Sequence, residues 1–443
     1  MDLRIFPPED LLTARVTIPQ SKSISNRVLI INSLTPGATP ITNAAKCDDT
    51  DVLVNALQAI SNASSGDKLG IDIGAAGTAM RFLTAYCATL SDLEVTLTGS
   101  ERMLERPIAP LVDALRQCGA EITYEGKQGF PPLRIKGTKL TGGDITIPGT
   151  ISSQFISALL MIAPTMANGL IINIEGQPVS KPYIEMTMKL MSLYGVESQF
   201  TPVAEGAVIE VGNEQYKPAD ITVEGDWSAA SYWYEIEALT SGWLTLDGLS
   251  RESVQGDRAL ADIFEGLGVN TEWEGEEGGI DLVASPDCTP RLTRDMSDTP
   301  DLVQAVAVTC AMLGIPFSLS GLNSLRIKET DRIEALSREL AKVGVVVEAE
   351  TFTAPMATEP DTVMSWNGQR RPIFELPQFD TYNDHRMAMA FAPCAIYIPG
   401  IVIKDSEVVT KSYPDFWQDL ANAGFKIVDA AEPLEPQESQ EDA

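Results

Sequence analysis

The chain repeats one pattern of polar and apolar positions: a short β-rich run, a polar turn and a helical run of small residues. Residues 14–19, 20–27 and 28–34 form the first such unit. Strands alternate apolar and polar positions with a period of two, whereas helices repeat near 3.6 residues. Further units are predicted where β-rich runs begin, at residues 70, 144, 220, 292 and 374. Six such units predict an α/β protein built from repeats.

The number of units favours two domains of three units each, since 443 residues exceed one typical core. Additional helices are predicted at residues 50–60, 107–118, 183–194, 258–267 and 333–343, and a Val-rich strand at residues 345–349. We place the domain change near residues 219–223, which gives one domain at residues 14–222 and a second at residues 1–13 and 223–429. The acidic tail, residues 430–443, lacks apolar periodicity and is predicted to be disordered.

The net charge of −30 argues against a nucleic-acid partner. The chain has 62 acidic and 32 basic residues, whereas a nucleic-acid surface needs a basic stripe that displaces counterions. The longest apolar run, residues 302–317, is interrupted and too short to cross a bilayer. The N-terminus has no basic region followed by a long apolar run. We therefore expect neither a nucleic-acid nor a membrane partner, and a cytoplasmic location.

Cysteine and histidine usage excludes several kinds of catalytic centre. The six cysteines are scattered and form no CxxC pair, so we expect buried free thiols of a reducing compartment. They are Cys47, Cys87, Cys118, Cys288, Cys310 and Cys394. His385 is the only histidine. A zinc cluster, a Ser-His-Asp triad and a Cys-His pair are therefore not expected.

The scarce basic residues gather in short polar turns at predicted helix starts. About a third of them lie there: Lys22, Arg27, Arg81, Arg106, Lys181, Arg326, Lys328, Arg332, Arg386 and Lys411. A helix N-terminus carries positive partial charge and unpaired N–H groups. An acidic protein that concentrates its cations in this way is predicted to hold a small anion in a positive island.

Residues 324–332 are the most concentrated example. Lys328 and Arg332 flank Glu329 within one helical turn, so cations surround a carboxylate at a helix start. This arrangement predicts an anion site with Glu329 as a proton carrier. A solvated, charged helix start is the alternative interpretation of this stretch taken alone.

Seven short strings along the chain resemble one family in their order and spacing. They are residues 22–27 (KSISNR), 77–81 (GTAMR), 105–108 (ERPI), 152–155 (SSQF), 328–332 (KETDR), 383–388 (NDHRMA) and 411–416 (KSYPDF). Together they resemble the 3-phosphoshikimate 1-carboxyvinyltransferase (EPSP synthase) family over about residues 14–425. The resemblance implies a two-domain inverse α/β barrel-like fold. Each domain would hold three βαβαββ-type repeats and close on an active site in the interdomain cleft.

The resemblance also implies a reaction and its participants. The enolpyruvyl group of phosphoenolpyruvate would pass to the 5-hydroxyl of shikimate 3-phosphate, with release of phosphate. The reaction belongs to the shikimate pathway to chorismate and aromatic amino acids. It would need no metal or redox cofactor, and a monomer would suffice. In this family the inhibitor glyphosate occupies the phosphoenolpyruvate position.

Each site residue receives a role from the resemblance. Shikimate 3-phosphate would contact Lys22, Ser23, Arg27, Ser152, Ser153, Gln154, Ser180, Tyr183, Asp301, Ser324 and Lys328. Phosphoenolpyruvate would lie among Lys22, Gly77, Arg106, Gln154, Arg332, Arg386 and Lys411. The catalytic group would be Lys22, Asp301 and Glu329. Asp301 would take the proton of the reacting hydroxyl, while Glu329 and Lys328 would serve proton transfer at the methylene carbon.

Three positions depart from the family pattern. Ala75 stands where Asn is common, Phe82 stands where Pro is frequent, and Ser324-Leu325 replaces a common Asn-Trp or His-Leu pair. None of these changes removes a charged group. We therefore expect altered affinities with retained activity.

Two other functions remain as alternatives. A UDP-N-acetylglucosamine enolpyruvyl transferase shares fold and cosubstrate, but that family has Lys-Asn in the first turn and a reactive cysteine in a mobile loop. Cys118 is instead typical of a packing residue at a helix end. The second alternative is a catalytically silent phosphate-sugar binding protein on the same scaffold. Retention of Lys22, Asp301 and Glu329 argues against it.

Overall fold

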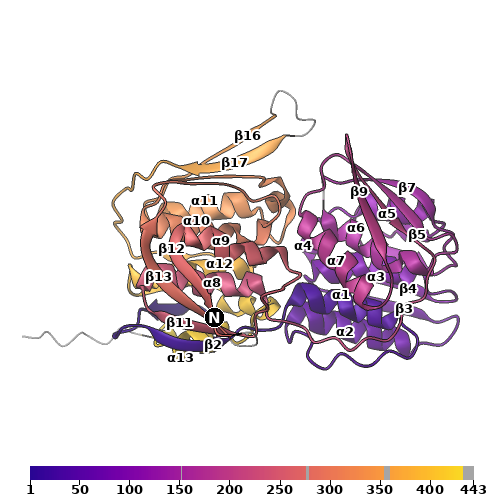
Figure 1. Cartoon of the computed structure of the whole chain (residues 1–443), viewed down its shortest axis with the longest axis horizontal. Coiled ribbons are helices and arrows are strands. Elements are labelled where there is room, and N and C mark those ends of the chain that lie inside the picture. The colour runs from indigo at the N-terminus through magenta and orange to yellow at the C-terminus, as the bar shows by residue number, and fades with distance from the viewer. Residues whose placement is uncertain (151, 276–278, 354–359, 433–443) are drawn as a thin grey trace, which may run out of the picture.

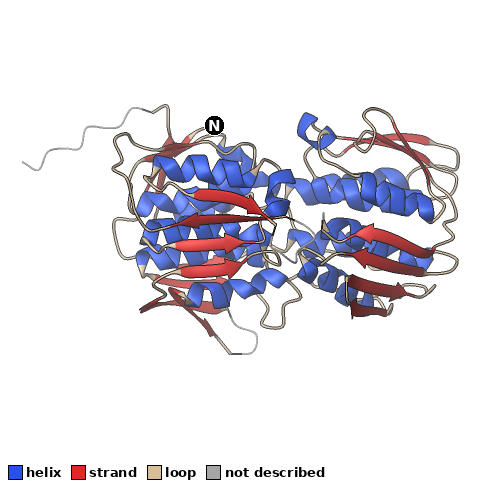
Figure 2. Ribbon diagram, turned by 90° about the horizontal axis from the view of Figure 1, so that it is seen from above, coloured by secondary structure: helices blue, strands red, loops and turns tan. Residues whose placement is uncertain are grey.

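The computed structural model describes residues 1–150, 152–275, 279–353 and 360–432. It has two lobes that lie side by side (Figure 1), and each lobe has its own helices and strands (Figure 2). Residues 433–443, most of the tail that we predicted to be disordered, lie outside the described residues. Within the described ranges, no helix is long and apolar enough to cross a membrane.

The first lobe contains seven α-helices and eight strands among its described residues. Its helices are α1 (Lys22–Ser33), α2 (Asp48–Ser61), α3 (Gly77–Ala88), α4 (Glu101–Leu104), α5 (Ala109–Gln117), α6 (Ser153–Ile162) and α7 (Lys181–Leu193), with the 3-10 turn η1 (Ala163–Thr165). Its strands are β3 (Lys68–Asp72), β4 (Glu94–Thr98), β5 (Glu121–Tyr124), β6 (Leu133–Lys136), β7 (Gly143–Pro148), β8 (Leu170–Glu175), β9 (Ser198–Val203) and β10 (Gly206–Val211).

The second lobe contains the remaining elements. Its helices are α8 (Trp227–Thr240), α9 (Leu260–Glu265), α10 (Val303–Leu313), α11 (Arg332–Lys342), α12 (His385–Phe391) and α13 (Phe416–Asn422). Its 3-10 turns are η2 (Gly256–Ala259), η3 (Pro300–Leu302), η4 (Asn323–Ile327), η5 (Ala392–Ile396) and η6 (Ser406–Lys411). Its strands are β1 (Leu3–Phe6), β2 (Thr13–Thr17), β11 (Trp243–Asp247), β12 (Leu267–Trp273), β13 (Ile280–Cys288), β14 (Leu292–Asp295), β15 (Phe317–Ser320), β16 (Glu348–Phe352), β17 (Asp361–Trp366), β18 (Gln378–Phe379), β19 (Ile401–Ile403) and β20 (Lys426–Asp429).

The strands form five four-stranded sheets of one design. The first lobe holds β3-β4-β6-β5 and β7-β8-β10-β9, and the second holds β12-β13-β11-β2, β14-β15-β17-β16 and β18-β19-β1-β20. Each sheet has one parallel pair and two antiparallel pairs. Helices lie between the parallel strands along the chain because such strands need a long crossover, and between β2 and β11 the chain also forms the whole first lobe. In four sheets the last two strands in chain order pair directly, whereas in the fifth β19 and β20 lie on either side of β1. The predicted α/β class and its βαβαββ repeat are confirmed.

The first unit along the chain differs from the other five. Helices α1 and α2 belong to it, but no four-stranded sheet accompanies them among the described residues. The N-terminal strand β1 completes the sheet of β18, β19 and β20 at the opposite end of the chain. Three sheets therefore lie in the second lobe and two in the first, although the repeat pattern led us to expect three in each.

Helices that are buried on all sides occupy the centre of each lobe. In α3 of the first lobe, every residue except Thr78 is buried, and all residues of α12 in the second lobe are buried. A helix without a polar face is stable only when neighbours cover it from every side. Two separate hydrophobic cores result, one around α3 and α6 and the other around α8, α10 and α12.

The chain crosses between the lobes twice, along two adjacent segments. Ile18 packs in the second core and Ile24 in the first, while Val223 packs in the first and Trp227 in the second. The two crossings lie side by side, because Gln20 and Gly225 form an isolated antiparallel bridge. A narrow double connection of this kind is typical of a hinge between two rigid bodies.

Several sequence predictions need correction at the crossings and elsewhere. Strand β2 pairs in parallel with β11, so it packs in the second lobe rather than starting a first domain at residue 14. Residues 220–224 form no strand, because they run along the crossing instead of joining a sheet. The last β-rich run, residues 374–377, precedes the short strand β18. Cys288 is exposed, and the other five cysteines are buried as expected.

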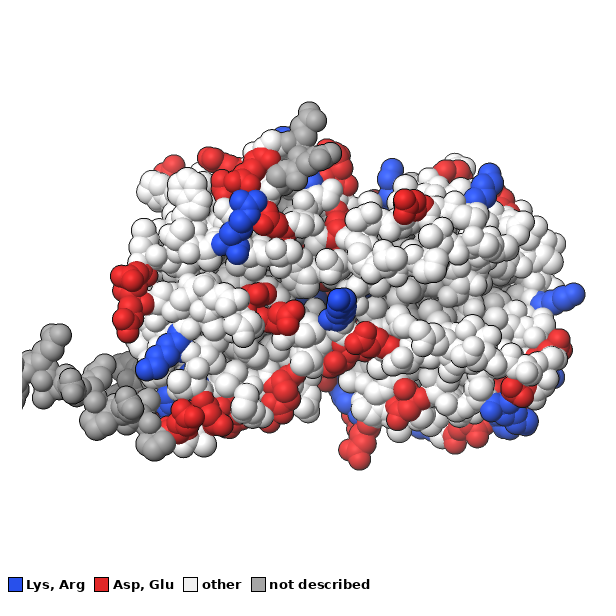
Figure 3. Space-filling view, turned by 90° about the horizontal axis from the view of Figure 1, so that it is seen from below, with Lys and Arg blue, Asp and Glu red and all other residues white. Residues whose placement is uncertain are grey.

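Charges are distributed over the surface in small groups. On the face shown in Figure 3, acidic and basic side chains are scattered over both lobes and form no continuous basic stripe among the described residues. This distribution agrees with the excess of acidic over basic residues in the chain.

Candidate active site

An open cavity lies between the two lobes. It is lined by helix starts from both of them, where unpaired N–H groups and positive partial charge favour anions. Of the predicted site residues, those that line it are Lys22, Ser23, Arg27, Gly77, Arg106, Ser152, Ser153, Gln154, Ser180, Tyr183, Asp301, Ser324, Lys328, Glu329, Arg332 and Arg386. Lys411 lies just behind this wall, with its Nζ 3.9 Å from Glu329 Oε1. The fold thus brings the whole predicted set together.

Hydroxyl groups mark the helix starts on the first-lobe wall. Ser21 caps α1 by accepting a hydrogen bond from the Ile24 N–H, and Ser152 caps α6 by accepting one from the Gln154 N–H. Such caps fix where a helix begins, because they satisfy an N–H that has no partner within the helix. They also fix the following polar residues, Lys22 and Ser153, at the edge of the cavity.

Arg27 is held rigidly on this wall although it is almost fully buried, with 2% exposure. Its Nε donates to Thr187 Oγ1 at 2.7 Å, and its Nη1 donates to the Ser23 carbonyl at 2.9 Å. The Phe82 ring lies 5.3 Å from the guanidinium carbon, which gives this departure from the family pattern a cation–π contact. Burial lowers the pKa of Arg27 to about 10, so the side chain still carries its charge at neutral pH.

Gly77 leaves room for an arginine. A Cβ atom at this position would lie 2.5 Å from Arg106 Nη1, closer than any normal contact. The absence of a side chain therefore lets Arg106 lie against the start of α3. Beside it, Gln154 donates a hydrogen bond from Nε2 to Thr78 Oγ1 at 3.2 Å.

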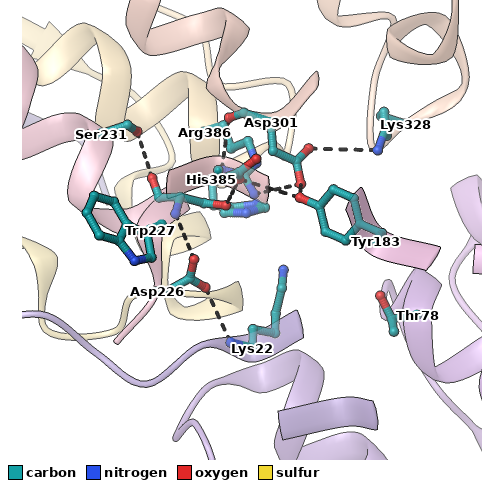
Figure 4. A network of polar contacts seen from close by, with 12 residues as sticks. Lys22, Thr78, Tyr183, Asp226, Trp227, Ser231, Asp301, Lys328, His385 and Arg386 are labelled. Atoms are coloured by element: carbon teal, nitrogen blue, oxygen red, sulfur yellow. Dashed lines mark hydrogen bonds and ion pairs between the residues drawn. The ribbon is translucent and has the colours of Figure 1, made fainter. Parts of the chain in front are cut away.

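Asp301 lies at the centre of the second-lobe wall (Figure 4). Its Oδ1 is 2.9 Å from Arg332 Nη1, and its Oδ2 is 3.0 Å from Arg386 Nη2. Lys328 Nζ lies 3.7 Å from Oδ1. Burial raises the pKa of this carboxyl, but Arg386, Lys328 and Arg332 together outweigh burial and hold the pKa well below its usual range. Asp301 is therefore an ionised acceptor that faces the cavity.

Glu329 is the point where cations of both lobes meet. Its Oε2 lies 3.0 Å from Arg332 Nη2, while its Oε1 lies 3.9 Å from Arg106 Nη1 of the first lobe and 3.9 Å from Lys411 Nζ. Burial opposes ionisation, yet these three cations hold the pKa of Glu329 well below its usual range. The protonation state of Glu329 thus depends on how strongly its neighbours are engaged elsewhere.

Lys328 differs from Glu329 because its surroundings disfavour its charged form. Burial, which disfavours its charged form, is the largest influence and lowers its pKa, although Asp301 raises it. This lysine gives up a proton more readily than an exposed lysine does. A carboxylate and a lysine on consecutive residues therefore offer two groups for proton transfer at one edge of the cavity.

Asp49 is a site residue that the sequence analysis missed. Its Oδ2 lies 3.0 Å from Lys22 Nζ, and its Oδ1 accepts from Lys411 Nζ at 2.7 Å. Asp49 therefore connects two predicted phosphoenolpyruvate contacts that are far apart in the sequence. An acidic residue in the first turn of a helix is ordinary, so the start of α2 carried no sign of this role.

Asp384 and His385 were also missed as site residues, although both lie in a motif that carried the resemblance. Asp384 caps α12 and accepts from Arg332 Nε at 2.6 Å, which fixes the arginine from behind. Burial lowers the pKa of His385 well below its usual range, and the charges of Lys22 and Arg386 lower it further. The imidazole is therefore neutral where it lines the cavity.

This arrangement suits the binding of small anions and the transfer of protons between them. Cations from two lobes line one cavity, and two ionised carboxylates lie on its wall beside a lysine of lowered pKa. Within the described ranges, no group of three or more His, Cys, Asp and Glu residues could hold a metal ion.

A family model and curated relatives that match this chain all carry the same family name. The family model of EPSP synthase (3-phosphoshikimate 1-carboxyvinyltransferase) matches residues 7–420. A 3-phosphoshikimate 1-carboxyvinyltransferase of Bacteroides fragilis strain YCH46 is 48% identical over 417 residues, which cover 94% of this chain and 96% of that protein. The protein of the same name from Shewanella halifaxensis is 37% identical over 437 residues, covering 94% of this chain and 98% of the relative.

A solved structure agrees in fold. The EPSP synthase from Acinetobacter baumannii superposes with a TM-score of 0.72 at 21% identity, covering 97% of this chain and 100% of that one. At this identity the likeness concerns the fold alone. The family model and the close relatives span nearly the whole chain, so it belongs to the EPSP synthase (3-phosphoshikimate 1-carboxyvinyltransferase) family.

Proposed function

We propose that this chain transfers the enolpyruvyl group of phosphoenolpyruvate to the 5-hydroxyl of shikimate 3-phosphate and releases phosphate. One observation carries this proposal: the cavity combines cations of both lobes with the carboxylates Asp301 and Glu329, in a member of this family. Two polyanionic substrates need such cations. The transfer of protons to and from carbon and oxygen needs such carboxylates.

The first-lobe wall suits shikimate 3-phosphate. Hydroxyl groups of Ser152, Ser153 and Ser180 lie at or beside the starts of α6 and α7, where they can donate to its phosphate. Arg27 is assigned to its carboxylate, because a guanidinium pairs with a carboxylate through two parallel hydrogen bonds. Asp301 faces this wall across the cavity and is the acceptor for the reacting hydroxyl.

Phosphoenolpyruvate fits the opposite part of the cavity. Arg332 and Arg386 approach from the second lobe, and Lys22, Arg106 and Gly77 approach from the first. Lys411 completes this set from behind Asp49. These cations would neutralise a phosphate and a carboxylate, and closure of the lobes would exclude bulk water and strengthen the charge interactions.

The reaction has two steps, an addition and an elimination, and each step requires two proton transfers. In the addition, the 5-oxygen of shikimate 3-phosphate bonds to C2 of phosphoenolpyruvate, and the proton of the 5-hydroxyl passes to Asp301. At the same time C3 gains a proton from the edge of the cavity formed by Glu329 and Lys328. The C2–oxygen bond to phosphate next breaks, phosphate leaves with the proton held by Asp301, and C3 returns a proton to the same edge. An entering anion competes for Arg332, Arg106 and Lys411, and this competition raises the pKa of Glu329 toward that of a proton donor.

The two lobes serve as domains that close on the substrates. Contacts already span them: Lys411 pairs with Asp49, and Arg102 donates to the carbonyl groups of Lys328 and Glu329. We divide the chain at the two crossings, which places residues near 19–222 in one domain and the remainder of the described chain in the other. Opening would break these contacts and expose the cavity.

Two further properties form part of the proposal. One copy of the chain supplies cations and carboxylates from both sides of the cavity, which supports a monomer as the working unit. The six cysteines form no disulfide, which supports the reducing cytoplasm as the location.

Phosphate release is the decisive test. Purified protein should release phosphate when shikimate 3-phosphate and phosphoenolpyruvate are both present and not when either is omitted. UDP-N-acetylglucosamine as acceptor is the control for the related transferase, and it should give no phosphate. Binding of both substrates without turnover would favour a silent binding protein and overturn the proposal.

A further inference from the structure

Asp257 is a buried carboxyl that the reaction described above does not use. It lies in η2 with 2% exposure and does not line the main cavity. Together with Tyr183 and Ser23 it lines a smaller hollow behind that wall. Its Oδ2 accepts a hydrogen bond from Ser228 Oγ and lies 3.4 Å from Tyr183 Oη. Its Oδ1 has no hydrogen-bond partner among the described residues.

The Tyr183 hydroxyl lies between the carboxyl groups of Asp301, which Figure 4 labels beside it, and Asp257. Its oxygen is 3.2 Å from Asp301 Oδ2 and 3.4 Å from Asp257 Oδ2. A phenol has one proton to donate. With both carboxylates ionised, only one of the two contacts is therefore a hydrogen bond. Both become hydrogen bonds when one carboxyl carries a proton and donates it to the tyrosine oxygen.

The surroundings decide which carboxyl carries that proton. Asp301 has Arg332, Arg386 and Lys328 within ion-pair distance, all of which favour its ionised form. Burial and then the charge of Asp301 raise the pKa of Asp257 to about 7, although the Ser228 hydroxyl and Arg386 oppose this rise. Asp226, at the start of α8, adds a further negative charge nearby. The proton therefore belongs on Asp257.

We propose that Asp257 is a positioning residue whose protonated carboxyl donates to Tyr183, so that Tyr183 directs its own proton to Asp301. This inference rests on the proposed function, in which Asp301 accepts the proton of the substrate hydroxyl. The relay holds Oδ2 of the base in place from one side, while Arg386 holds it from the other. The base is then oriented before the substrate arrives, and orientation of this kind accelerates a reaction.

Ionisation of Asp257 disconnects the relay. An Asp257 carboxylate competes with Asp301 for the single Tyr183 proton, and the hydroxyl no longer points steadily to the base. The ratio kcat/KM reports the protonation states of the free enzyme. Its value for shikimate 3-phosphate should therefore fall as the pH rises through the pKa of Asp257. The other groups that face Asp257 are Asp301, Arg386, Asp226 and Tyr183.

The test compares pH profiles of kcat/KM for the wild type and Asp257→Asn. The asparagine amide donates to Tyr183 at every pH. The kcat/KM of the wild type divided by that of the variant should therefore fall about tenfold between pH of about 5.5 and pH of about 9. A factor of about ten corresponds to the loss of about one hydrogen bond. Substrate ionisation cancels in this ratio. Asp262→Asn removes an exposed carboxyl on the neighbouring α9 and should follow the wild type at every pH.

Tyr183→Phe provides a second, independent measurement. It keeps the ring but removes the connecting hydroxyl, so its profile should lack the decline that the wild type shows. The inference would be overturned if the ratio of the wild-type kcat/KM to that of Asp257→Asn were constant with pH. It would also be overturned if kcat/KM of Tyr183→Phe still declined as the pH rises. Absence of turnover in the wild type would instead contradict the proposed function, which keeps the two failures distinct.

Discussion

The two walls of the cavity present different chemistry to a ligand. The first-lobe wall offers serine hydroxyls, the Gln154 amide and four basic residues, and Asp49 is its only carboxylate among the residues that line the cavity. The second-lobe wall offers Asp301 and Glu329, each in direct contact with Arg332. The first-lobe wall thus combines neutral donors with an excess of cations, whereas on the second-lobe wall two carboxylates share the same arginine.

This difference separates binding from proton transfer. Neutral donors and isolated cations keep their state when an anion arrives, so they suit anchoring. Carboxylates that are held ionised by shared cations rise in pKa when those cations bind a ligand instead, so they suit proton transfer. The comparison predicts that substitutions on the second-lobe wall lower kcat, whereas substitutions on the first raise KM.

The largest expected effect comes from Asp301→Asn and Glu329→Gln. Each variant keeps the size of the side chain but removes a group that exchanges protons, so kcat should fall by about 10²–10⁴-fold. Binding of shikimate 3-phosphate, measured by calorimetry, should change little. Near wild-type turnover in both variants would remove the mechanistic role of the second-lobe wall.

Gly77→Ala tests how closely the first-lobe wall fits the smaller anion. The added methyl group would displace Arg106, and we expect glyphosate, which is longer than phosphoenolpyruvate, to lose more affinity. Competitive inhibition constants should rise by about 10–200-fold, with a smaller rise in KM for phosphoenolpyruvate. Gly70→Ala is the control, because no atom lies within 4 Å of its added Cβ. Equal inhibition of wild type and Gly77→Ala would exclude Gly77 from this site.

Arg27→Lys tests anchoring by the first-lobe wall. Lysine keeps the charge but loses the planar donors that Thr187 and the Ser23 carbonyl orient. We expect KM for shikimate 3-phosphate to rise by about 10–100-fold, with a smaller change in kcat. The matched control is Arg134→Lys, an exposed exchange on β6. A fall in kcat at constant KM would contradict the division of labour between the walls.

Asp49→Asn tests the contact between the walls and should have the smallest effect. The substitution weakens the ion pairs of Asp49 with Lys22 and Lys411, and loss of the Lys411 pair, which joins the lobes, favours their open arrangement. We expect KM for phosphoenolpyruvate to rise about tenfold and the radius of gyration, measured by small-angle scattering, to increase. Asp51→Asn, an exposed residue of the same helix, is the control. An unchanged radius of gyration and KM would deny Asp49 this role.

Much of the architecture could be predicted from local pattern alone. The helical runs after the polar turns became α1, α3, α6, α8, α10 and α12, because small apolar residues in such runs are compatible with burial on every side. The capping residues Ser152 and Asp384 also lie where the turns end. These features depend on neighbours within a few residues, so the sequence contains them directly.

Other features depended on contacts between distant segments. Strand β2 has the same local pattern as the strands of the first lobe, and only its pairing with β11 assigns it to the second. Residues 220–224 have strand-like composition, but the crossing gives them no sheet to join. Periodicity describes which face of a segment is apolar, not which partner will cover that face.

The sequence by itself determined which charged residues this protein concentrates at its helix starts, since those residues lie in short contiguous motifs. Only the tertiary structure decided how they act on one another. Asp49 reaches Lys411 across 362 residues, and Tyr183 reaches Asp301 across 118. The pKa of a carboxyl follows from burial and from charges within a few ångströms, and those distances exist only after the two lobes come together.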